Sequence, residues 1–129
     1  MGKHTLGDLQ HAIMKVLWQR SEATVAEVHD ALYDDRSLAP TTIATMLRKM
    51  EDKGVVAHRV DGRQFVYRPT VSEPEVRTSM VSELIDRLFS GDAAALVSHL
   101  VADRAIDSDE LERLRALLAE AETAREEER

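Results

Sequence analysis

Apolar residues recur at helical spacing in three segments of the first half of the chain, at residues 8–19, 25–33 and 40–53. Within each segment, apolar side chains three and four positions apart lie on one face, which predicts an amphipathic helix. Before the second segment, Thr24 and Glu27 have the spacing of a capping box, in which each side chain hydrogen-bonds to the other residue's backbone N–H. The pattern therefore predicts three consecutive helices.

The third segment has the clearest ends. Pro40 suits the first position of a helix, and Gly54 suits the position just after its last turn. Its predicted buried face consists of Ile43, Met46, Leu47 and Met50. Its other face carries Thr41, Thr42, Thr45, Arg48, Lys49 and Lys53. Hydroxyl groups in the first turns, followed by cations, suit a helix whose N-terminus enters the DNA major groove.

After Gly54 the period of the pattern changes to two, which predicts strands over 55–60 and 63–68. Between them, Asp61-Gly62 is a strong signal for a hairpin with a type I′ turn. Three helices followed by a hairpin are the outline of a winged helix. The hairpin would be the wing, with Arg63 at its tip, where a cation can contact a phosphate or the minor groove.

The 58 residues after position 71 predict three more helices, one starting at a second capping box at Ser72, one over 93–102 and one after Asp107. So short a segment seldom has a sufficient core of its own, and its wide apolar faces predict a symmetric partner. We therefore expect a mainly α protein, with a winged-helix DNA-binding domain at 1–71 and a helical dimerisation region at 72–129. The residues expected at the dimer interface are Met80, Leu84, Leu88, Leu96, Leu100, Leu111, Leu114 and Leu118.

Charge is unevenly distributed along the chain. The net charge of the whole is −7, whereas residues 1–71 carry +1 and residues 72–129 carry −8. Residues 36–71 alone carry +4. Because salt screens charges beyond roughly 8–10 Å, this local excess matters more to a polyanion than the total does. A nucleic-acid partner for the first domain is therefore compatible with an acidic protein.

Several classes of protein are disfavoured by what the sequence lacks. It has no cysteine, no apolar run of the ~20 residues that cross a bilayer, no Gly-rich phosphate loop and no recognisable nucleophile motif. The five histidines are not paired at helical spacing, so we expect neither a metal site nor a cofactor. We expect a cytoplasmic protein that is not an enzyme and has no membrane insertion. If His99 lies in the dimer interface, its protonation would weaken association.

The order and spacing of these pieces resemble the BlaI/MecI/CopY family of bacterial transcriptional repressors. The resemblance covers about the first 70 residues well, and the remainder in layout only. The motifs that carry it are LGDL (6–9), VLW (16–18), TVAEV (24–28), LAPTTIATML (38–47), KGVV (53–56) and GRQFVYRP (62–69). The family implies a homodimer that binds a palindromic operator and represses transcription, with its C-terminal helices forming the dimer interface.

The resemblance also implies modes of induction. In penicillinase repressors, a membrane-linked sensor protease cuts an Asn-Phe pair in a leucine-rich helix of the dimerisation region. The nearest match here is the segment 96–100, which gives Val97, Ser98 and His99 as the candidate cleavage region, although the Asn-Phe pair is absent. The copper-responsive branch carries a C-terminal cysteine motif, which this chain lacks. Control of β-lactam resistance or related genes is implied by analogy alone.

Each candidate residue also has an ordinary structural explanation. The threonines could form an exposed polar face, and the cations could complement the helix dipole. We expect DNA contacts from Thr24, Thr41, Thr42, Thr45, Arg48, Lys49, Lys53 and Arg63. The function predicted from these residues is a sequence-specific repressor that acts as a homodimer on a double-stranded operator. The alternative is a winged-helix module that binds another protein.

Overall fold

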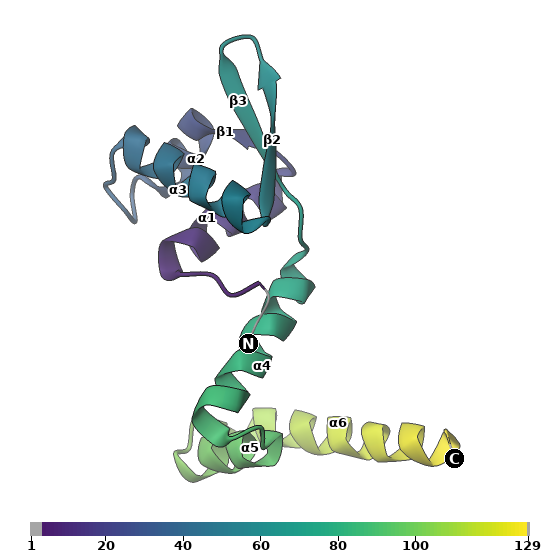
Figure 1. The fold of residues 1–129 in the computed structure, drawn as a ribbon. Helices are drawn as coiled ribbons and strands as arrows, with labels where there is room; N and C mark the ends of the chain where they lie inside the picture. Colours follow the sequence, from purple (N-terminus) through teal and green to yellow (C-terminus); the bar gives the residue numbers. More distant parts are fainter. Residues whose placement is uncertain (1–3, 129) are drawn as a thin grey trace. The chain divides into compact units, whose positions relative to one another are not determined.

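The computed structural model describes residues 4–128 (Figure 1). Its contacts separate the chain into two compact units, one ending at Leu84 and the other starting at Ile85. The elements, in chain order, are α1 (Asp8–Arg20), β1 (Ala23–Thr24), α2 (Val25–Leu32), α3 (Pro40–Lys53), β2 (Val56–Asp61), β3 (Gln64–Pro69), α4 (Glu73–Phe89), α5 (Ala93–Ala102) and α6 (Ser108–Glu127). The mainly helical, winged-helix prediction is confirmed, with element ends within one residue of those expected in the first unit.

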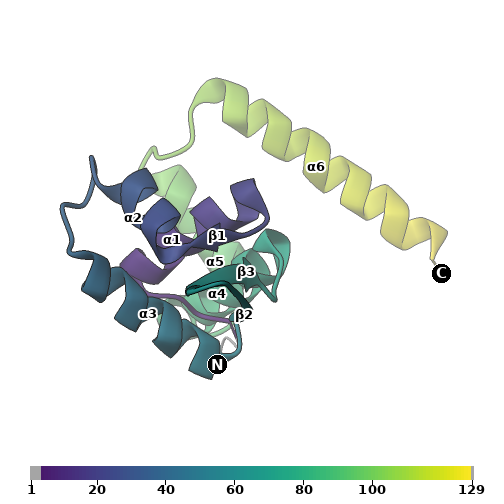
Figure 2. The same ribbon diagram turned by 90° about the horizontal axis from the view of Figure 1, so that it is seen from above.

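The core of the first unit forms where α1, α2 and α3 meet, with β2 packed beside α3 (Figure 2). The largest fully buried side chains of this core are Ile13, Met14, Leu17, Val28, Ile43, Leu47, Met50, Val55 and Val76. The third helix begins at Pro40, as predicted, and Gly54 follows it with a left-handed φ of 88°. Local chemistry therefore fixes where α3 begins and ends. Burial of its apolar face fixes its rotation about the helix axis.

The sheet has three antiparallel strands in the order β1-β3-β2. The hairpin of β2 and β3 is the predicted wing. The two-residue strand β1 was not predicted, and it pairs Ala23 with Tyr67 and Thr24 with Val66. A segment this short shows no alternation that a sequence pattern could detect. Its pairing attaches the base of the wing to the start of α2.

The predicted type I′ turn centred on Asp61-Gly62 is wrong. Asp61 pairs with Gln64, so the two central residues of the turn are Gly62 and Arg63. Gly62 has a φ of 63°, and Arg63 is not among the described residues with positive φ. Positive φ at the first central position alone is the pattern of a type II′ turn, for which glycine is preferred there. Arg63 thus lies in the turn itself, at the tip of the wing.

The first unit continues beyond the predicted boundary at residue 71. Ser72 begins α4 with the predicted capping box, its hydroxyl accepting from the Glu75 N–H at 3.2 Å. Val76 is then buried in the core, and Met80 packs against it. The indole N–H of Trp18 donates to the Val71 carbonyl at 2.9 Å, which attaches the connecting segment to α1. The first part of α4 therefore belongs to the compact unit of the winged helix.

The second unit consists of the end of α4 together with α5 and α6. Asp92 and Asp107 cap the two last helices, each accepting from a backbone N–H three residues later. The last helix extends through the charged end of the chain to Glu127. Among residues 85–128 none is buried, although the helices carry many leucines. The unit thus has helices without an enclosed interior.

The cap of α2 gives a first testable prediction. Replacing Thr24 with alanine removes the hydroxyl that accepts from the Glu27 N–H, and we expect a loss of about 1 kcal/mol in the free energy of unfolding. Urea denaturation measures this loss. Thr78→Ala is the matched control, because Thr78 is exposed within α4 and alanine favours a helix interior. Equal effects of the two substitutions would contradict the assigned role of the cap.

Candidate nucleic-acid interface

The outer face of α3 presents the polar side chains that the sequence predicted. Thr41, Thr42 and Thr45 are exposed on the first turns of the helix, and Arg48 and Lys49 are exposed on the later turns. The opposite face is buried through Ile43, Leu47 and Met50. Burial of this one stripe leaves the hydroxyl groups and the two cations directed to solvent.

The cations of this surface differ in their contacts. Within residues 4–128, the side chains of Arg48, Lys49 and Arg63 form no hydrogen bond or ion pair. Lys53, in contrast, donates through Nζ to the Thr5 carbonyl and to Gln10 Oε1, the latter at 3.2 Å. Lys53 therefore holds the N-terminal segment against α3. Its expected contact with DNA stays a prediction.

A cleft of about 380 Å³ lies where the wing tip meets the N-terminal ends of α2 and α3. Thr24 and Arg63, which are far apart in the sequence, both line it, together with Pro40 at the start of α3. Gln64 and His29 also line it and were not predicted. Two helix N-termini and the unpaired Arg63 guanidinium favour anions at this cleft, whereas the Asp30 carboxylate on its rim opposes them.

Thr24 has a structural task in this cleft. Its hydroxyl accepts from the Glu27 N–H at 3.2 Å, and its own N–H donates to Glu27 Oε1 at 2.9 Å. The hydrogen bond from the backbone of Thr24 lowers the pKa of Glu27. A threonine hydroxyl that accepts one hydrogen bond still has a hydrogen to donate. Thr24 is thus able to cap α2 and donate to a phosphate oxygen at the same time.

His29 positions the segment that leads into α3. Its Nε2 lies 2.8 Å from the carbonyl oxygen of Leu38. Because a carbonyl only accepts, this nitrogen carries the hydrogen. The contact joins α2 to the loop just before Pro40, across nine residues of sequence. No periodic signal in the sequence could have indicated it.

A second pair joins the end of α3 to the wing. His58 Nδ1 lies 2.7 Å from Glu51 Oε1, and the His58 ring stacks on Phe65 with centroids 4.2 Å apart. The sequence pattern did not predict this contact of His58. Nearby, burial raises the pKa of Tyr67, and the Glu51 carboxylate raises it further. The contact of His58 with Glu51 therefore fixes the wing to the third helix, and the ring stack joins the two strands of the wing.

Arg59 is a cation of the wing that forms an ion pair within the chain. Its guanidinium donates to Glu22 Oε1 at 2.9 Å. This hydrogen bond lowers the pKa of Glu22 and raises that of Arg59. Arg63, beyond it at the tip, has no such partner within residues 4–128. The structure thus distinguishes a paired arginine from an unpaired one on the same hairpin.

The residues predicted for the dimer interface fall into three groups. Met80 packs against the core of the first unit. Leu88 and Leu118 are exposed by 66% and 55%, and Leu84 is also exposed. Half-buried positions are taken by Leu96, Leu100, Leu111 and Leu114. The candidate cleavage residues Val97, Ser98 and His99 are exposed on α5, with the His99 ring 5.9 Å from that of Phe89.

Neither a metal centre nor a membrane helix is found in the part of the chain that the structure describes. Residues 4–128 contain no group of three histidine, cysteine or carboxylate side chains that could hold a metal ion. Within the same residues, no helix is both long and apolar enough to cross a bilayer.

Comparison with known proteins is decisive for the family. The sequence model described as penicillinase repressor matches residues 6–120. The chain belongs to the penicillinase repressor family. This confirms the resemblance found in the winged-helix motifs and extends it through the C-terminal helices.

Named relatives agree with this assignment. The transcriptional regulator BlaI of Mycobacterium tuberculosis is 40% identical over 119 residues, which cover 91% of this chain and 85% of the relative. The penicillinase repressor of Bacillus licheniformis is 27% identical over 122 residues, which cover 95% of each chain. A solution structure of the DNA-binding domain of the repressor BlaI superposes with a TM-score of 0.51 at 35% identity, covering 56% of this chain and 88% of that domain. Relatives of this chain are thus transcriptional repressors, which are not enzymes.

The pair on the wing gives a second prediction. Because Arg59 lowers the pKa of Glu22, the pair stabilises the fold above the ordinary glutamate pKa, and this contribution is lost as pH falls through the folded value. In Arg59→Met we expect the Glu22 pKa to return to about its ordinary value of 4.5, as measured by NMR titration of the carboxyl carbon. Arg68→Met is the control, because Arg68 acts on Glu22 through charge alone and should produce a smaller rise. A larger rise with Arg68→Met would contradict the assignment.

Proposed function

We propose that this protein is a sequence-specific transcriptional repressor that binds a palindromic operator as a homodimer. The observation that carries the proposal is the outer face of α3, where exposed threonines precede two cations that lack partners within residues 4–128. The cleft with Arg63 lies at the N-terminal end of the same helix. Family membership and the repressor relatives support the same function.

In the proposed complex, each protomer places the N-terminal part of α3 in a major groove. Thr42 and Thr45 would read base edges, and Thr41 would lie beside them near the phosphates. Arg48 and Lys49 would contact the backbone along the same groove, and Arg63 would contact a phosphate or the minor groove next to it. The pairing of His58 with Glu51 would keep the wing at a set angle to α3, so that both reach the duplex together.

The charge distribution suits selective rather than general binding. Non-specific affinity for DNA comes mostly from neutralised phosphates. Residues 72–129 carry a net charge of −8, so this part of the chain adds nothing to that affinity. Base contacts by α3 would then supply a large share of the discrimination between sites.

A second copy of the chain is the partner proposed for the C-terminal helices. Residues 85–128 bury no side chain, and their exposed leucines include Leu88, Leu117 and Leu118. A two-fold dimer would cover these faces and set the spacing of the two α3 helices. Operator half-sites would then lie about one helical turn apart, or a multiple of it.

The controlled genes and the signal extend the proposal by analogy. The names of relatives include penicillinase and methicillin resistance, so genes for β-lactam resistance are the proposed targets, reached in the cytoplasm. If a membrane-linked sensor protease releases the operator, the exposed segment at Val97, Ser98 and His99 would be its substrate.

The test of the function is fluorescence-anisotropy binding of the full chain to the DNA upstream of its own gene, against a scrambled duplex, at two salt concentrations. We expect nanomolar affinity and a preference of ~10³ or more for the native DNA. Equal and weak affinity for both duplexes would contradict specific repression of its own gene. If the chain instead bound another protein with an affinity that does not depend on salt, the alternative function, a winged-helix module that binds another protein, would be favoured.

Removing the wing cation gives a third prediction. Arg63→Ala should weaken binding to every duplex and reduce the slope of log affinity against log salt by about one, because one phosphate contact is lost. Thr42→Ala should instead cost roughly 1–3 kcal/mol at the operator and little on other DNA. Arg125→Ala, in exposed α6, controls for the loss of charge. An unchanged salt slope in Arg63→Ala would show that the wing contacts no phosphate.

A fourth prediction concerns the dimer. Leu118→Asp should shift the protein to the monomer in sedimentation velocity and lower operator affinity, because it buries a charge in an apolar interface. Leu118 is exposed in the single chain, so the substitution leaves the folded protomer intact. Ala119→Asp adds the same charge about 100° further around α6, away from the stripe that carries Leu111, Leu114 and Leu118, and should stay dimeric. A dimeric Leu118→Asp protein would exclude this face as the interface.

A further inference from the structure

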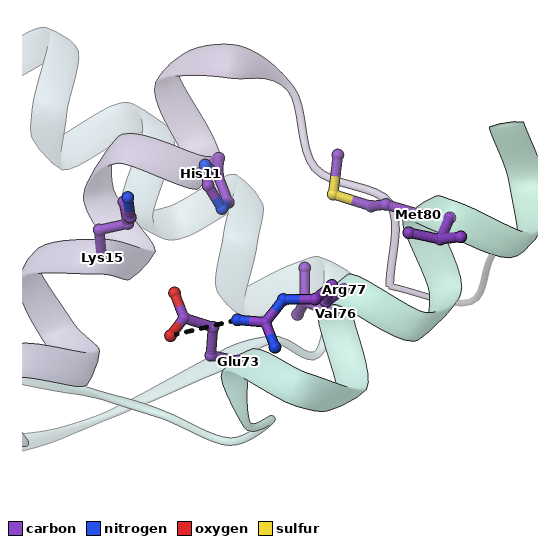
Figure 3. Close-up of a pocket in the computed structure, with 7 residues that line it drawn as sticks. His11, Lys15, Glu73, Val76, Arg77 and Met80 are labelled. Carbon is purple, nitrogen blue, oxygen red and sulfur yellow. Dashed lines mark ion pairs between the residues drawn. The ribbon is translucent and has the colours of Figure 1, made fainter. Parts of the chain in front are cut away.

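A cavity of about 330 Å³ lies between α1 and the first half of α4, within the first unit (Figure 3). None of its lining residues belongs to the proposed DNA surface. Its size is at the lower end of the range for small-molecule sites, about 300–1,000 Å³. The cavity is therefore large enough for a small organic molecule, and the repressor function does not use it.

One side of the cavity is apolar. Val76, Met80 and Val81 of α4 line it. Val76 is buried in the core, Met80 is half-buried against it, and Val81 is 45% exposed at the rim. A ligand with an apolar body would cover this surface and gain free energy in proportion to the area removed from water.

The other side is polar and comes mainly from α1. Figure 3 shows His11 and Lys15 on α1 facing the α4 side chains across the cavity. Within residues 4–128, the Lys15 ammonium forms no hydrogen bond or ion pair. His11 packs edge-on against Trp18, with ring centroids 6.1 Å apart. The charged Lys15 side chain of α1 thus lies beside the opening and has no partner within residues 4–128.

The remaining charges of the cavity cancel. Arg77 and Glu73 lie one turn apart on α4 and form an ion pair at 3.8 Å. Their charges neutralise each other, so Lys15 supplies the net positive charge. The complementary ligand is a monoanion, and a carboxylate matches the hydrogen-bond donors of Lys15 and His11.

We propose that this cavity binds a small organic monocarboxylate with an apolar body, and that binding of this ligand weakens the operator complex. The regulatory half of the proposal rests on the proposed repressor function. α4 is one continuous helix from the cavity to Phe89, and it carries Leu84 and Leu88 of the proposed dimer interface. A ligand held between α1 and α4 would favour a different packing angle of α4 against the winged helix. A dimer would contact both half-sites of one operator only within a narrow range of these packing angles.

Ligand binding would be a signal distinct from cleavage of the chain. A ligand in the cavity would release the operator without cutting the chain. The ligand changes operator binding only if its own affinity differs between the free and the operator-bound protein.

The experiment uses the full chain and two probes, phenylacetate and its uncharged analogue phenylacetamide. Methyl NMR titration should show saturable shifts at Val76 and Met80 with phenylacetate, and binding at least ~10-fold weaker with the amide, because a charge-assisted hydrogen bond is lost. Lys15→Met should weaken phenylacetate to a similar extent, and Arg125→Met should not. Val81→Trp, which fills the rim, should abolish binding while the spectrum stays that of a folded protein. Absence of saturable binding of phenylacetate overturns the site.

Coupling to DNA is measured separately, by anisotropy with and without saturating phenylacetate. We expect operator affinity to fall at least ~5-fold, and phenylacetate affinity to fall by the same factor when operator is present. Saturable binding with unchanged operator affinity overturns the regulatory half. If the unliganded protein binds no operator at all, the repressor function fails, whereas the NMR titration still decides the site.

Discussion

Burial of one apolar stripe on α3 is the constraint on which the rest of this structure depends. Ile43, Leu47 and Met50 are fully enclosed by the other helices of the first unit and by the adjoining chain. A helix fixed by one face can present only the opposite face to a partner. The position of every threonine and cation on its outer surface therefore follows from packing, before any contact with DNA is considered.

Local signals were sufficient for the architecture of the first unit. Proline at one end of α3, glycine at the other, and capping boxes before α2 and α4 are chemistry within a few residues, so the sequence pattern located these ends. Two features depended on strand pairing and were missed or wrong. The strand β1 exists only because β3 pairs with it, and the register of Asp61 with Gln64 moved the turn by one residue.

The candidate site was predictable to a similar degree. The exposed face of α3 follows from periodicity, so its residues could be named from the sequence. Contacts between elements could not be named, because they depend on how the elements pack. The pair of Glu51 with His58, the bond from His29 to Leu38 and the internal contacts of Lys53 are of this kind. They decide which charges remain available to a partner and which are already neutralised.

The lack of any buried side chain in residues 85–128 has a consequence for how this protein responds to its own abundance. Helices without an interior would gain stability from the proposed association, and their melting temperature would then rise with protein concentration. While dimers are scarce, their number grows as the square of the monomer number. If the proposed dimer forms, a cell that halves its stock of the protein would lose about three quarters of the form able to hold two half-sites. Such a repressor would switch over a narrower range of expression level than one that binds as a single chain.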